Sequence, residues 1–216
     1  MMADVLTALP AVLHNRNYTL IYAPTQLTRS GMTPGFEHRW HQARTTILTI
    51  CEQCHALAVP HGLTVYQKRA DGAGFQAHHN VNVANLKSLM DSAPMPAQLS
   101  LAPVLQTVLE RYFSAKAAGQ QPVNGEIILI LLDNEPTDRP AIAKQIVAAS
   151  QKLDHNSELG IGWLQVGDDY ITKGFLTNLD DNLRQQGARF DIVDHKMIQQ
   201  VSLNDLATFL MDVLTD

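Results

Sequence analysis

The chain has 216 residues, 45% of them hydrophobic and 17% charged, and its formal net charge is −5. This length and composition are typical of one globular domain with a substantial core. The acidic balance argues against nucleic acid as a partner, because phosphate backbones are bound by clustered Lys and Arg, and no basic run here is longer than Gln67-Lys68-Arg69.

The first 17 residues, MMADVLTALPAVLHNRN, contain an acidic residue and no Lys or Arg before their apolar stretch. A secretory signal has the reverse pattern. No run approaches the roughly 18 apolar residues of a membrane span. We therefore expect a cytoplasmic protein without membrane contact. Two cysteines in a chain of this length do not make a disulfide framework.

Six short segments have the composition of β-strands. They are residues 18–22, 63–66, 75–81, 126–132, 159–166 and 189–193. The fourth, EIILILL, is apolar at nearly every position, which is typical of a central parallel strand covered on both faces. The third is polar and is expected at an edge of the sheet.

Helical patterns fill the gaps between these strands. They cover residues 37–58, 83–90, 101–118, 138–153, 171–183 and 203–214. Strands that alternate with helices predict an α/β fold, a doubly wound and mostly parallel six-stranded sheet with helices on both faces. We expect a single domain over residues 1–216, with a core at about 17–195 and the helix at 203–214 docking on it.

The stretch CEQCH at residues 51–55 matches a haem-attachment pattern. Covalent haem attachment requires export, and a thioredoxin-like pair requires a helix N-terminus. Cys51 and Cys54 lie instead on the apolar stripe in the middle of a predicted helix, and a zinc site would need two further ligands. Core packing is the favoured interpretation, and a haem, redox or zinc role is the alternative.

Loops at the carboxyl ends of neighbouring parallel strands converge in doubly wound sheets, and such loops often carry the functional residues. Three loops are expected there: the YAPTQLTRSGM stretch at residues 22–32, residues 98–100 and residues 133–136. The first offers hydroxyl and amide groups at Thr25, Gln26, Thr28 and Ser30 but no carboxylate before Glu37.

Five segments, in order along the chain, resemble the von Willebrand factor A (vWA) domain family. They are NYTLIYAPTQLTRSGM, RWHQAR, LAPVLQTVLERYFSAKAAG, IILILLDNEPTDR and ELGIGWLQVGDD. The resemblance runs from about residue 18 to residue 193 and implies a Rossmann-like fold. It also implies a site for Mg²⁺ or Mn²⁺ built from two serines, a threonine and two aspartates, which are hard oxygen ligands suited to such ions.

This sequence departs from the family pattern at the metal site. Ala23 stands at the position of the first aspartate, Leu27 at that of the second serine, and Leu99 at that of the threonine. Thr25 keeps a hydroxyl, and Asp133 is the aspartate that remains. Because a dication needs several well-placed oxygens, these departures from the family pattern predict a lost metal site and no cofactor.

Two alternatives concern the same loops. If weak Mg²⁺ or Mn²⁺ binding survives, its expected ligands are Thr25, Ser100 and Asp133. If it does not, the apolar replacements predict a surface that binds protein by packing. The candidate partner-binding surface consists of Thr25, Gln26, Leu27, Thr28, Leu99, Ser100, Asp133, Asn134 and Glu135.

No G-x-S-x-G, G-x-x-x-x-G-K-[ST] or G-x-G-x-x-G motif occurs, so we expect no enzyme activity. For Asp133 itself, a turn or capping role is the simpler interpretation. The resemblance implies a protein–protein interaction or assembly module, and it allows an ATPase-chaperone partner. A metal-dependent protein-binding domain and a structural subunit of a multiprotein or phage-like assembly are the alternatives.

Overall fold

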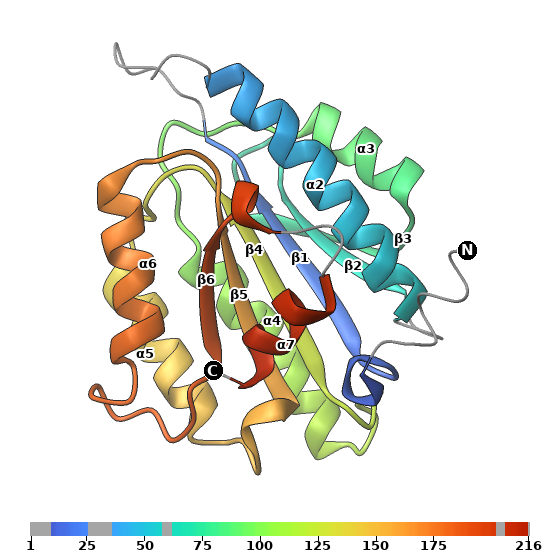
Figure 1. Cartoon of the computed structure of the whole chain (residues 1–216), viewed down its shortest axis with the longest axis vertical. Helices are drawn as coiled ribbons and strands as arrows, with labels where there is room; N and C mark the ends of the chain where they lie inside the picture. Colours follow the sequence, from blue (N-terminus) through green and yellow to red (C-terminus); the bar gives the residue numbers. More distant parts are fainter. Residues whose placement is uncertain (1–9, 26–35, 58–61, 202–205, 216) are drawn as a thin grey trace.

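A computed structural model describes residues 10–25, 36–57, 62–201 and 206–215 of the chain. Six strands form one sheet in the order β3-β2-β1-β4-β5-β6 (Figure 1). Their bounds are β1 (Asn17–Ala23), β2 (Leu63–Lys68), β3 (Phe75–Val81), β4 (Glu126–Leu132), β5 (Leu159–Gln165) and β6 (Val193–Met197). All neighbouring pairs are parallel except β2 and β3. The predicted doubly wound, mostly parallel fold class is thus confirmed.

Helices cover both faces of the sheet (Figure 1). The helices are α2 (Phe36–Leu57), α3 (Val83–Ser92), α4 (Ala102–Ala117), α5 (Arg139–Ser150), α6 (Tyr170–Asn182) and α7 (Leu206–Thr215). Short 3-10 turns are η1 (Ala11–Leu13), η2 (Asn156–Glu158) and η3 (Ile198–Gln200). No helix within the described part of the chain is both long enough and apolar enough to cross a membrane.

Side chains along the central strands point alternately to the two faces of the sheet, and this divides the core into two layers. In β4, Ile127, Leu129 and Leu131 pack with α2, α3 and α7. Ile128 and Ile130 face the other way and pack with α4, α5 and α6. Successive side chains of a strand point to opposite faces, so a strand covered on both faces is mostly apolar. All seven residues of β4 are buried, and Glu126 is its only charged residue.

The edge strands account for most of the errors in the predicted strands. β3 lies at one edge, as its polar sequence predicts, and most of its residues are partly or fully exposed. At the other edge, a strand was predicted at 189–193, but the structure places β6 at Val193–Met197. The prediction was wrong because β6 is polar and half-exposed, whereas the apolar residue Ile192 just before it is buried outside the strand.

The C-terminal helix α7 packs across β5. Two glycines of β5 make this possible, because a Cβ atom added at Gly160 would lie 2.5 Å from the carbonyl oxygen of Val213. At Gly162 the nearest atoms, from Leu129 and Val213, would be 3.0 Å away. Phe209 and Val213 of α7 are buried. Residues 203–205, the start of the predicted helix, lie outside the described residues.

Candidate functional site

The carboxyl ends of β1, β4 and β5 lie side by side at one end of the strands. We call the loops that follow these strand ends the C-terminal edge. Thr25 lies two residues beyond β1, and Asp133 directly follows β4. Parallel pairing aligns these ends, since Ala23 is opposite Leu132 and Leu132 is opposite Gln165. Of the predicted surface, Gln26, Leu27 and Thr28 lie outside the described residues.

The carboxylate of Asp133 is bound by groups of the protein itself. The backbone N–H of Thr25 donates to both oxygens, at 3.0 Å to Oδ1 and 3.2 Å to Oδ2. The Thr25 hydroxyl donates to Oδ1 at 2.9 Å, and the Trp40 side chain donates a further hydrogen bond. Thr25 and Asp133 are only 2% and 5% exposed. The pair therefore joins the loop after β1 to the end of β4.

Burial raises the pKa of Asp133 from 3.8 to about 6. The hydrogen bonds from Thr25 and Trp40 favour the ionised form and oppose this rise. Removal from water is the larger effect. The carboxylate is therefore held by neutral donors at a site where charge is costly.

Ser100 belongs to a separate capping arrangement. Its hydroxyl donates to Oδ2 of Asp138 at 2.7 Å. The same carboxylate accepts the backbone N–H groups of Leu101 and Ala102, at 3.1 and 2.8 Å. These are donors at the start of α4 that have no partner within the helix. Asp138 thus ties the loop before α5 to the N-terminus of α4, a role that the sequence did not reveal.

The predicted surface role of Leu99 is wrong. Its side chain is 2% exposed and belongs to the core between the sheet and α4, α5 and α6. Its carbonyl accepts hydrogen bonds from the N–H and hydroxyl of Thr137, at 2.7 and 3.0 Å. The leucine fills space under the loop and does not contribute an exposed apolar patch.

Asn134 and Glu135 remain at the surface and are partly exposed. The Asn134 side chain accepts the N–H of Glu135 at 3.0 Å, which is a local turn contact. Glu135 pairs with Arg139, the first residue of α5, at 2.9 Å. Both residues are therefore available to a partner at this edge.

The three residues expected to bind a metal, Thr25, Ser100 and Asp133, do not form a common ligand set. Ser100 is hydrogen-bonded to Asp138, while Thr25 and Asp133 bond to each other. Mg²⁺ requires about six oxygens in near-octahedral geometry. Within the described residues, no group of three or more His, Cys, Asp or Glu side chains could hold a metal ion.

Two exposed apolar residues at this edge were missed from the sequence. Tyr170 and Ile171, at the start of α6, are 80% and 39% exposed. Asp169 caps the helix, accepting from the N–H and hydroxyl of Thr172 at 2.7 Å each. Its neighbour Asp168 pairs with Arg39 of α2 at 3.8 Å. The sequence did contain a signal for their exposure. Residues 172, 176 and 179, which are buried, form a helical stripe that excludes 170 and 171.

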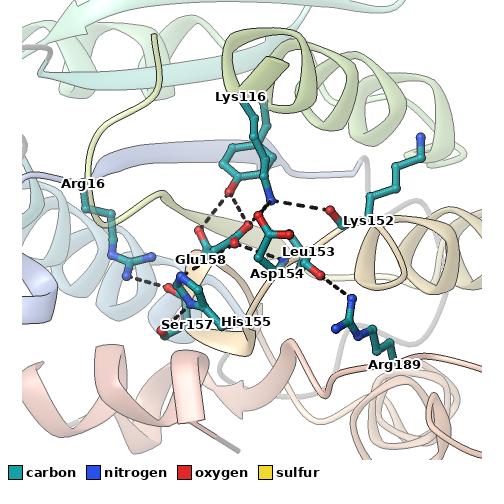
Figure 2. Close-up of polar contacts among 10 residues, drawn as sticks. Arg16, Lys116, Lys152, Leu153, Asp154, His155, Ser157, Glu158 and Arg189 are labelled. Atoms are coloured by element: carbon teal, nitrogen blue, oxygen red, sulfur yellow. Dashed lines mark hydrogen bonds and ion pairs between the residues drawn. The ribbon is translucent and has the colours of Figure 1, made fainter. Parts of the chain in front are cut away.

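A polar cluster lies at the other end of the strands from the C-terminal edge, around the turn before β5 (Figure 2). Lys116 of α4 donates to the buried carboxylate of Glu158 at 2.6 Å and pairs with Asp154 at 2.9 Å. Arg16 and Arg189 donate to the backbone carbonyls of Ser157 and Leu153, at 2.8 and 2.9 Å. Figure 2 shows these side chains converging on backbone and carboxylate groups of the turn. The cluster thus fixes the turn between α5 and β5 to α4.

The cysteines of CEQCH are both free and buried, at 1% and 0% exposure. They pack in the core beneath α2, and burial raises the pKa of both thiols. A thiol used in redox chemistry or metal binding needs the opposite shift. This geometry supports the core-packing interpretation.

No family model and no curated protein matches the sequence. Among solved structures, the chain is similar to the manganese-loaded TRAP protein of Plasmodium vivax, with a TM-score of 0.52 and 6% sequence identity. The match covers 94% of this chain and 74% of that one. At this identity the likeness shows the fold alone. Together with the strand order, it gives this chain a vWA-like α/β fold.

Proposed function

We propose that this chain is a non-enzymatic protein-binding module whose C-terminal edge binds its partner without a metal ion. The observation that carries the proposal is the state of Asp133. Its carboxylate already accepts hydrogen bonds from Thr25 and Trp40, so binding a cation would require breaking buried contacts.

The exposed groups at the same edge suit protein contact. Tyr170 supplies a large aromatic surface beside Ile171, and aromatic side chains are enriched where proteins bind one another. The ion pairs Glu135–Arg139 and Asp168–Arg39 provide polar neighbours. An apolar centre with a polar rim is the usual organisation of a protein interface.

The manganese in the TRAP structure makes metal dependence the alternative to test. The test is a tagged pull-down from the source cells, with Mg²⁺ plus Mn²⁺ in one arm and EDTA in the other. The bait is the wild-type chain or the double variant Tyr170→Ser/Ile171→Ser. Val123→Ser is the matched control, because Val123 is 91% exposed in the loop before β4, at the opposite edge of the sheet.

We expect the same partner in both arms, its loss with the double variant, and its retention with Val123→Ser. A partner captured only with metal would refute metal independence. Retention by the double variant would move the interface away from Tyr170 and Ile171. Constant self-association of the purified chain, with no other partner, would favour a structural assembly subunit.

A further inference from the structure

A groove of about 730 Å³ lies between α4 and α5, on the face of the sheet that these two helices cover. We call it the α4–α5 groove. Its walls run from Gln106 to Ala117 on α4 and from Lys144 to Lys152 at the end of α5. Eleven residue steps of helix span about 16 Å, or three turns. The groove is therefore as long as a short docked helix.

The base of the groove is apolar. Leu109, Phe113 and Ala117 line it from α4, and Ala148 and Ala149 line it from α5. The small side chains on α5 leave room for another backbone to approach, while Phe113 offers a partly buried aromatic ring. A surface of this kind gains free energy when an apolar stripe covers it.

Both walls are helices, and this limits the conformation of an occupant. The N–H and C=O groups in the interior of α4 and α5 are bonded along each helix, so they cannot pair with an extended strand. A segment that enters the groove must satisfy its own backbone hydrogen bonds. An amphipathic helix meets this condition, and helix-in-groove binding is a recurring mode of recognition.

The two walls of the groove carry different charges. Lys144 and Lys152, on the α5 side, are exposed, and neither forms an ion pair with the described residues. Lys152 lies over the ring of Phe113, at 5.2 Å from its centroid. On the α4 side, Glu110 accepts a hydrogen bond from Gln106 at 2.7 Å. The α5 side thus offers two exposed cations, Lys144 within α5 and Lys152 two residues beyond its end.

We propose that the α4–α5 groove is a second docking surface, which binds an amphipathic helix of a partner protein. The apolar stripe of that helix covers Phe113 and Ala148. Carboxylates two turns apart on its flank pair with Lys144 and Lys152. This surface is separate from the C-terminal edge and does not depend on the function proposed for that edge.

The probe is a capped peptide of 16 residues with a leucine stripe at helical spacing and two glutamates two turns apart on one flank. One control peptide has lysines in place of those glutamates, and another has a central proline that breaks the helix. Binding is followed by amide chemical shifts of the isotope-labelled full chain. We expect saturable shifts in α4 and α5 with the acidic peptide and neither control.

Charge reversal separates groove binding from general attraction. Lys144→Glu/Lys152→Glu is expected to lower the affinity for the acidic peptide by about 10-fold and to raise the affinity for the lysine peptide. Lys87→Glu/Arg184→Glu makes the same change in net charge at other exposed positions and is expected to leave binding unchanged. Ala148→Tyr, which fills the groove without changing charge, is expected to abolish binding.

Three results would overturn the proposal. One is the absence of shifts in α4 and α5 up to about 1 mM acidic peptide. Another is equal weakening by the two double variants. The third is self-association of the chain, by sedimentation, that Lys144→Glu/Lys152→Glu disrupts, because the occupant would then be a second copy of this chain.

Discussion

Asp133 is a buried carboxylate whose ionisation opposes folding. Its pKa is raised from 3.8 to about 6, so the folded chain holds the proton more tightly than the unfolded chain does. The stabilising effect of that proton is complete below pH 3.8 and is lost as the pH rises through about 6. The whole shift corresponds to ~3 kcal/mol.

Asp133→Asn is expected to remove this part of the pH dependence. Between pH 4.5 and pH 7, the free energy of unfolding of the wild type should fall by about 2 kcal/mol more than that of the variant. Urea unfolding at a series of pH values measures the difference. Parallel pH profiles for the two proteins would show that the carboxylate is not desolvated as described.

Arg111 and Glu126 form an ion pair at the N-terminal end of β4. Glu126 is 1% exposed and accepts hydrogen bonds from Arg111 and from Thr19, the latter at 2.6 Å. Burial raises the pKa of Glu126, and Arg111 opposes the rise. The charge of Arg111 therefore compensates for much of the cost of burying this carboxylate.

Arg111→Ala should lower the free energy of unfolding by about 3 kcal/mol at neutral pH, because it leaves a buried charge without its partner. In a Glu126→Gln background the same change should cost less than about 1 kcal/mol. Urea unfolding of the four proteins completes the cycle. An equal loss in both backgrounds would mean that Arg111 stabilises the fold through packing alone.

At the scale of elements, α7 can pack on β5 because Gly160 has no side chain. Gly160→Ala would place a Cβ atom 2.5 Å from the Val213 carbonyl oxygen, so α7 must shift. We expect a loss of about 2–3 kcal/mol. Gly174→Ala is the matched control, because nothing lies within 4 Å of its Cβ and it is inside α6.

The control should gain up to about 1 kcal/mol from the higher helix propensity of alanine. Urea unfolding of both variants gives the comparison. A Gly160→Ala variant as stable as the wild type would contradict the close packing of α7 on β5.

The central elements could be predicted because their local pattern and their final environment agree. EIILILL is apolar at every position after Glu126 and becomes β4, buried on both faces. The edge strand β6 has no such pattern, since only two of its five residues are buried. Its position depends on pairing with β5, which is a tertiary contact that a local window does not contain.

The site was partly predictable for the same reason. Asp133 and Thr25 follow strands, so their meeting at one edge could be inferred from topology. The sequence did not show that Trp40 would donate a hydrogen bond to the Asp133 carboxylate. It also did not show that Ser100 would donate to Asp138. Leu99 was assigned to the surface because its burial depends on how α4 and α5 close over the loop.

At the scale of the whole molecule, hydrogen bonds among Thr25, Trp40 and Asp133 hold together the C-terminal edge of the vWA-like fold. Those contacts join the loop after β1, the end of β4 and α2. On this account the edge is formed before any partner arrives. Its stability should therefore not respond to divalent ions.

The most direct test is a titration of the purified chain with Mn²⁺, followed by the electron paramagnetic resonance signal of the free ion. Asp133→Asn and wild-type chains are compared. The account predicts no saturable site below about 1 mM Mn²⁺ in either protein. One ion bound per chain at micromolar concentration in the wild type, and lost in Asp133→Asn, would contradict it.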